Sequence, residues 1–145
     1  MGEQYGGASA ATGNLSRASA ATGKFVVGID NGGTKNNATV LDAEGTFLIA
    51  DMIELPSRVL EGPAVAIDEL VAVFDEVLSR AGIRRAQVAV VGLGTPGPAS
   101  AEGVISSRGS TNFAHPEWFG FDIRTALQDK LGLPVVYIND ANAAA

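Results

Sequence analysis

Residues 24–35 read KFVVGIDNGGTK, and this stretch decides the fold. The aromatic and β-branched side chains of 25–29 form a short apolar run, which predicts a buried strand. The strand ends at Asp30, and the two glycines that follow indicate a tight turn. Residues 36–41 then alternate between polar and apolar side chains, which predicts a second strand lying against the first.

The next elements follow closely along the chain. A tight turn and the apolar character of 46–55 predict a third strand that ends at Pro56. Strands joined by such short links are antiparallel neighbours. A helix follows, because apolar side chains recur at helical spacing over 67–78 while charged ones fall on the other side. Pro63 suits the first turn of this helix and Gly82 suits its C-terminal cap.

Two more strands and a second helix complete the order. Residues 88–93 are a continuous apolar run reached through a helix, which predicts a strand parallel to its neighbour and buried on both faces. Residues 99–120 are irregular in pattern. Asp122 suits the N-cap of a second helix that ends at Gly132, and 134–138 form a last buried strand.

This order predicts an α/β fold with a mixed five-stranded sheet and flanking helices. It resembles a ribonuclease-H-like half-domain, the unit that sugar kinases, actin and heat-shock ATPases place on either side of an ATP cleft. In open α/β sheets, ligands lie beyond the carboxyl ends of the strands. Three loops of this chain follow such ends, so we expect them to meet at one edge.

The composition limits the possible classes of protein. A chain of 145 residues with 46% apolar and 18% charged residues suits one globular domain, and a net charge of −6 argues against a nucleic-acid partner. The sequence holds no cysteine, which fits a cytoplasmic protein, and no apolar run approaches the ~20 residues that span a membrane. Residues 1–23 are mostly small and contain ASAATG twice, so we expect a flexible low-complexity leader before a domain at 24–145.

The first candidate motif is DNGGTK at 30–35. Gly32 and Gly33 allow backbone conformations closed to other residues, so successive amide hydrogens can point at one anion, and Thr34 adds a hydroxyl donor. Asp30 could hold Mg²⁺ through water. No helix follows, so this is not a Walker loop. An ordinary hairpin turn also favours Asn-Gly, and the motif alone leaves both interpretations open.

Two further motifs follow strand ends. GTPGP at 94–98 forms a rigid loop whose exposed backbone could meet a polyhydroxylated ligand, or it is merely a tight connection. NDAN at 139–142 places Asp140 after a buried strand, where a carboxylate suits a general base or a plain helix N-cap. Each motif taken alone is consistent with both the functional and the structural interpretation.

In order and spacing, DxGGTK, GxPGP and NDANAA resemble the ROK family of repressors and sugar kinases, which includes bacterial glucokinases. The resemblance covers 24–145 and implies a hexose kinase that uses ATP and Mg²⁺. It implies that the ATP phosphates meet Gly32, Gly33, Thr34 and Lys35, with Asp30 on the metal side. The substrate-binding positions that it implies are Gly97, Thr111, Asn112, Asn139 and Asp140. It also implies that Asp140 is the catalytic base, which accepts the proton of the attacking sugar hydroxyl.

The sequence departs from the family pattern in two places. Asn31 and Asn36 stand where the family usually has aliphatic residues, which could alter the packing of the loop between them. The segment 113–120 is longer and more aromatic than usual, and we expect it to form part of the rim of the sugar site. His115 within it is expected to be a solvent-exposed loop residue rather than a metal ligand.

Family members are longer than this chain, and their second half carries a Cys- and His-rich zinc motif, a sugar-binding Glu and the adenosine-binding loops. We therefore expect a truncated chain that does not phosphorylate sugar by itself, while the full-length form is expected to be a homodimer. One alternative is a sugar-sensing ROK transcriptional regulator, for which 1–23 is too short to form the winged helix-turn-helix. Another is a noncatalytic, actin-like ATP-binding module, which would have no use for Asn139 and Asp140. The identity of the hexose stays open.

Overall fold

The computed structural model describes residues 23–96, 99–106 and 112–139. Residues 1–22 of the predicted leader and residues 140–145 lie outside the described residues. The strands and α-helices in chain order are β2 (Phe25–Asn31), β3 (Lys35–Leu41), β4 (Ile53–Pro56), α1 (Pro63–Ala81), β5 (Val88–Thr95), α2 (Ile123–Leu131) and β6 (Val135–Asn139).

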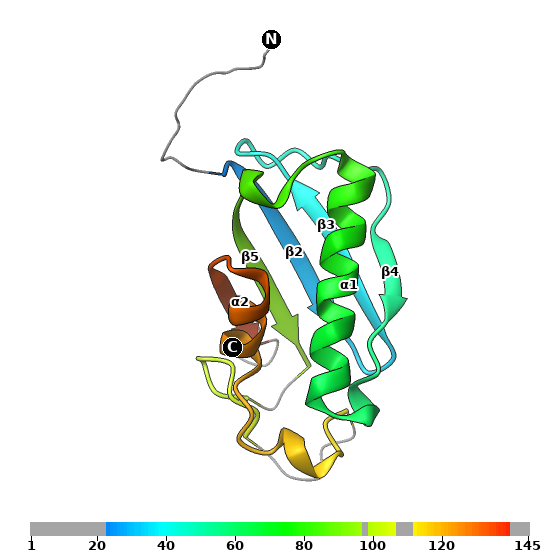
Figure 1. Ribbon diagram of the computed structural model, residues 1–145, viewed down its shortest axis with the longest axis vertical. Coiled ribbons are helices and arrows are strands. Elements are labelled where there is room, and N and C mark those ends of the chain that lie inside the picture. Colours follow the sequence, from blue (N-terminus) through cyan, green and yellow to red (C-terminus); the bar gives the residue numbers. More distant parts are fainter. Residues whose placement is uncertain (1–22, 97–98, 107–111, 140–145) are drawn as a thin grey trace.

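The five strands form one mixed sheet in the order β4-β3-β2-β5-β6 (Figure 1). β2 pairs antiparallel with β3, and β3 antiparallel with β4. β2 pairs parallel with β5, and β5 parallel with β6. These pairings confirm the predicted α/β fold, including the antiparallel hairpins at the start and the parallel strands reached through helices.

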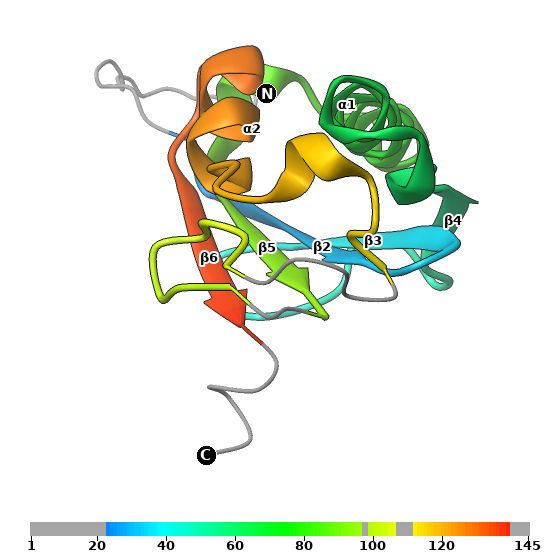
Figure 2. The same ribbon diagram turned by 90° about the horizontal axis from the view of Figure 1, so that it is seen from below.

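Both α-helices pack on the same face of the sheet (Figure 2). The core lies between that face and the helices, because alternate strand residues such as Val27, Ile29, Val91 and Leu93 are buried there. From α1, the apolar stripe supplies buried side chains at Ile67, Leu70, Val73, Phe74, Val77 and Leu78. The sheet is therefore covered by described residues mainly on one side.

The helix boundaries follow the predicted caps. Gly82 and Gly132 adopt left-handed conformations at the C-terminal caps of α1 and α2, with φ of 71° and 70°. At the start of α2, Asp122 Oδ1 accepts a hydrogen bond of 2.9 Å from Thr125 N. Within the described ranges, neither helix combines the length and the apolar character needed to cross a membrane.

The prediction of a third strand over 46–55 is wrong in its extent, because β4 spans only Ile53–Pro56. The chain returns beside β3 at an isolated bridge between Leu41 and Phe47. An uninterrupted hairpin from that bridge would pair Ala38 with Ala50, whereas Ala38 pairs with Ile53. The residues between Phe47 and Ile53 that exceed this regular pairing are looped out of the sheet. The apolar segment 46–55 is therefore divided between the bridge at Phe47 and the short strand β4.

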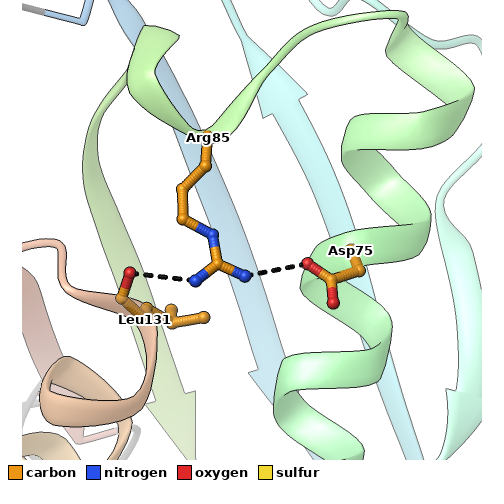
Figure 3. Close-up of polar contacts among 3 residues, drawn as sticks. All are labelled: Asp75, Arg85 and Leu131. Carbon is orange, nitrogen blue, oxygen red and sulfur yellow. Dashed lines mark hydrogen bonds and ion pairs between the residues drawn. The ribbon is translucent and has the colours of Figure 1, made fainter.

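The guanidinium of Arg85 joins the two helices (Figure 3). Its Nη1 donates to the carbonyl oxygen of Leu131 at 3.2 Å, at the end of α2, and its Nη2 lies 3.1 Å from Asp75 Oδ1 on α1. The guanidinium carbon also lies 5.3 Å from the centroid of the Phe74 ring. Arg85 therefore satisfies a helix-terminal carbonyl while it contacts α1 through both charge and an aromatic face.

We predict that Arg85→Ala lowers the free energy of unfolding by about 1.5 kcal/mol, because an ion pair, a hydrogen bond and a ring contact are lost together. Asp75→Ala removes only the ion pair, which is half-exposed to solvent, and should cost about 0.5 kcal/mol. Urea unfolding followed by circular dichroism measures both. Equal losses for the two variants would contradict this account of Arg85.

Candidate functional site

The carboxyl ends of β2, β5 and β6 lie at one edge of the sheet. Asp30 pairs with Gly94, and Gly94 pairs with Ile138, so these three residues form a row across the parallel strands. Beyond this row the chain continues into the 32–34 turn after β2, into Pro96 after β5 and into Asn139 at the end of β6. The three loops singled out in the sequence therefore leave the sheet side by side.

The structure describes part of the predicted site. Of the predicted residues, it describes Asp30, Gly32, Gly33, Thr34, Lys35 and Asn112, together with the backbone of Asn139 at the end of β6. Gly97, Thr111 and Asp140 lie outside the described residues. Their roles, like the roles of the others, stay predictions.

Space, rather than an unusual backbone conformation, limits the two glycines of the first loop, strictly at Gly32 and through a displaceable side chain at Gly33. Neither Gly32 nor Gly33 has φ in the left-handed region. The prediction that these glycines adopt backbone conformations closed to other residues is therefore wrong. A Cβ atom on Gly32 would lie 2.8 Å from the carbonyl oxygen of Lys35, and one on Gly33 would lie 2.3 Å from Asn112 Oδ1. The structure thus brings Asn112 directly against the predicted phosphate loop, although 79 positions in the sequence separate Asn112 from Gly33.

An aromatic cluster holds Asn112 in this place. The ring centroids of Phe113 and Trp118 are 4.7 Å apart, and Trp118 meets Phe121 edge-on at 5.5 Å. Trp118 is fully buried, and its Nε1 donates to the carbonyl oxygen of Val59 at 2.7 Å. The aromatic segment was expected at the rim of the sugar site, but Phe113 and Trp118 are core residues that anchor the chain beside the loop.

Two other residues of this segment lie nearer the surface. Phe119 is half-exposed. His115 was expected to be exposed, but it is partly buried, with its ring facing Gly62 and its Nδ1 accepting a hydrogen bond of 3.2 Å from Glu117 N. His115 is held in this partly buried position because it caps the 3-10 turn Pro116–Trp118.

The side chain of Lys35 forms an ion pair with a residue of the neighbouring strand β4. Its Nζ lies 3.3 Å from Glu54 Oε1 on β4, and both side chains are more than half-exposed. Thr34 and Lys35 line a pocket of about 280 Å³ together with Glu54, Leu55 and Pro56. An exposed ion pair of this kind is worth no more than about 1 kcal/mol, so the ammonium can exchange Glu54 for an anion at small cost. Sequence reasoning missed Glu54, because only the β3–β4 register brings it to the loop.

Asp30 lies at the end of β2 with an exposed side chain on the sheet face opposite the helices. Within the described residues, no group of three His, Cys, Asp or Glu side chains could hold a metal ion. A carboxylate of this kind can still contact a hydrated Mg²⁺ that is bound mainly by phosphate oxygens and water. The position of Asp30 at the loop edge fits that chemistry.

A buried amide pair lies directly below the loop. Asn31 Nδ2 donates to Asn36 Oδ1 at 2.7 Å, between the end of β2 and the start of β3. Both residues are at least 99% buried. Among the described residues, Asn31 Oδ1, Asn36 Nδ2 and the buried Ser57 Oγ have no hydrogen-bond partner. Sequence reasoning also did not identify Ser57 as a residue next to the loop. Its backbone N–H donates to the carbonyl oxygen of Thr34 at 3.0 Å.

Comparison with known proteins gives consistent results. The model of the ROK family matches residues 26–145. The glucokinase of Streptomyces coelicolor is 31% identical over 123 residues, which cover 83% of this chain and 34% of the relative. A solved ROK hexokinase from Thermus thermophilus is 37% identical, with a TM-score of 0.66 over 83% of this chain and 37% of that chain. A glucokinase from Streptomyces griseus, solved with glucose and AMPPNP, is 27% identical, with a TM-score of 0.58 over 83% and 34%.

We predict non-additive effects of substitutions at the buried amides. Asn36→Leu leaves the Asn31 amide buried without its partner and should lower the free energy of unfolding by about 2 kcal/mol. The double variant Asn31→Leu/Asn36→Leu replaces both polar groups by apolar ones and should recover most of that loss. Urea unfolding of the two single variants and the double variant measures the coupling. Simply additive losses would show that the two side chains do not depend on one another.

Proposed function

Because this chain belongs to the ROK family, we propose that it forms the phosphate-loop part of an ATP-dependent hexose kinase of the glucokinase type. The observation that carries the proposal is the contact between Gly33 and Asn112, which sets a predicted phosphate-binding turn against a predicted sugar-binding residue. This contact lies at the edge where β5 and β6 also end. The glucokinase of Streptomyces coelicolor supports the hexose as substrate.

The proposed nucleotide site uses the 32–35 turn. Gly32 would shape the turn, because its N–H already donates to the carbonyl oxygen of Lys35. The backbone N–H of Gly33 and the Thr34 hydroxyl would bind the phosphate oxygens of ATP, and Lys35 would neutralise part of their charge. Asp30 would contact the hydrated Mg²⁺, which supplies further charge neutralisation. Phosphoryl transfer depends mainly on positioning and on electrostatic stabilisation, and this turn provides donors for both.

The proposed catalytic base is Asp140. It follows Asn139, whose backbone pairs with Thr95 at the loop edge. Asp140 would accept the proton of a sugar hydroxyl as that oxygen bonds to the γ-phosphorus and the bond to the bridging oxygen breaks, which releases ADP. Asn139, Asn112, Thr111 and Gly97 would bind other sugar hydroxyls and so fix the reacting one within hydrogen-bond reach of Asp140.

The chain spans about a third of the length of the curated relatives that it matches. We therefore predict that the purified 145-residue chain does not form ADP from ATP and glucose, because the predicted loop and base make only part of the site. A coupled ADP assay with the Streptomyces coelicolor glucokinase as positive control measures this. Glucose-dependent ADP formation above the enzyme-free rate would contradict the prediction.

The role of Asp140 can be tested in a family-length chimera, in which residues 24–145 replace the matched segment of the Streptomyces coelicolor glucokinase. We predict that Asp140→Asn lowers kcat by about 10²- to 10⁴-fold, which is the usual contribution of a positioned general base. The amide keeps the hydrogen-bonding shape, so the glucose dissociation constant from calorimetry should change little.

The matched control is Asp129→Asn, which makes the same change at an exposed position of α2 and should leave kcat unaltered. An Asp140→Asn chimera with unaltered kcat would remove Asp140 from the mechanism. A chimera that binds glucose but shows no ATP-dependent phosphorylation before any substitution would contradict the proposed function as a whole.

A further inference from the structure

Two carboxylates lie in one row across the strands beside the 32–35 turn. Asp30 of β2 pairs with Asn37 of β3, and Asn37 pairs with Glu54 of β4. Directly paired residues point to the same face of a sheet, with their Cβ atoms about 5 Å apart. Since Asn31, next to Asp30, is buried on the side of the helices, this row lies on the other face. The turn therefore leaves the sheet beside two negatively charged groups.

The cations nearest to the turn along the chain are paired with carboxylates. Lys35 Nζ lies 3.3 Å from Glu54 Oε1. Arg58 is the next cation in the sequence, and its Nε lies 2.9 Å from Glu69 Oε2. Its Nη1 lies 3.7 Å from Glu61 Oε2. Both cations have their own counterions, so neither offers an unpaired positive charge to a phosphate chain.

The two sets of ion pairs differ in how easily they open. Arg58 contacts two carboxylates, and one of them, Glu69, is only 23% exposed. The side chains of Lys35 and Glu54 are 60% and 55% exposed, and both line the pocket that includes Thr34 of the turn. Lys35 is therefore the cation that can turn toward a phosphate chain. Glu54 is the counterion that Lys35 then has to leave or to share.

A shared ammonium brings two anions close together. An ammonium that contacts a phosphate oxygen at the usual ~2.8 Å while it stays near Glu54 leaves the carboxylate about 6 Å from that oxygen. At such a distance in water, a pair of unit charges changes an affinity by roughly threefold. The effect multiplies with each negative charge of a triphosphate, and a bound divalent cation cancels part of that charge. Glu54 therefore repels a metal-free triphosphate more strongly than a metal-bound one.

We propose that Glu54 makes the 32–35 turn selective for a nucleoside triphosphate that already carries a divalent cation. Glu54 keeps Lys35 paired until the nucleotide arrives, and its charge then opposes a triphosphate whose own charge is not masked. Asp30, at the other end of the row, adds to this repulsion and attracts a hydrated cation. The inference rests on the proposed function, because it concerns the same nucleotide site.

The test measures the binding of AMPPNP to the family-length chimera by calorimetry at low ionic strength, once with Mg²⁺ and once with EDTA. Glu54→Gln keeps the shape of the side chain and removes its charge. We expect this variant to bind metal-free AMPPNP about tenfold more tightly, and Mg²⁺-bound AMPPNP no more than about threefold more tightly. The ratio of the metal-free to the metal-bound dissociation constant should therefore fall at least threefold.

The matched control is Glu76→Gln, which removes the same charge from a carboxylate that lies 3.0 Å from Arg80 Nε on α1. Its ratio of dissociation constants should equal that of the unsubstituted chimera. A ratio that stays the same in Glu54→Gln, or that falls equally in both variants, would overturn the inference and leave the proposed function intact. A chimera that binds AMPPNP neither with Mg²⁺ nor without it would contradict the proposed function, and the inference with it.

A second measurement serves if the chimera does not fold. Inorganic tripolyphosphate is added to the 145-residue chain without Mg²⁺, and the amide NMR signals of Gly33 and Thr34 are followed. The dissociation constant should be about tenfold lower in Glu54→Gln and unaltered in Glu76→Gln. Equal dissociation constants in Glu54→Gln and the unsubstituted chain would refute the role of Glu54. Signals that do not move in any of the three chains would count against the phosphate turn itself, and so against the inference as well.

Discussion

The parallel pairing of β2 with β5, and of β5 with β6, is the constraint on which the rest of the structure depends. It sets Asp30, Gly94 and Ile138 in one row, so three chain segments leave the sheet at the same edge. Because side chains alternate along a strand, the same register also brings Gly28 beside Gly92 on the face that points away from α1 and α2. One set of backbone hydrogen bonds therefore decides both the position of the candidate site and which residues lie on that face.

A second constraint acts through the core rather than through the sheet. Asn112 reaches Gly33 because the chain that follows it is fixed by buried aromatic rings, and Trp118 also donates a hydrogen bond to the carbonyl oxygen of Val59. A segment without a strand or α-helix can hold a side chain accurately when its neighbours are buried in this way. The aromatic residues near the site thus act on the site from inside the core.

The parts of the fold that were predicted correctly depend on local signals. Caps such as Asp122 and Gly132 lie at the ends of the helices that they define, and short links between strands leave few possible pairings. The extent of β4 could not be predicted in this way. No feature of the sequence distinguishes the looped-out residues before Ile53 from strand residues, and the register is set by pairing with β3. The contact of Gly33 with Asn112 joins distant positions, so only the folded chain reveals that a side chain at position 33 would displace Asn112.

The buried amides below the loop have a consequence for its shape. A Walker loop holds its amide donors at the start of a helix, whereas this turn connects two strands and must be held by its own stems. Three contacts do so: Gly32 N–H donates to the carbonyl oxygen of Lys35 at 2.8 Å, Asn31 to Asn36 at 2.7 Å, and Ser57 N–H to the carbonyl oxygen of Thr34 at 3.0 Å. Burying amides whose remaining polar atoms lack partners costs stability, so aliphatic residues at 31 and 36 would serve the core better. Their place between the two stems makes the pair a local clasp that holds the turn in one conformation. Under the proposed function, this would lower the entropy lost when the turn binds phosphate.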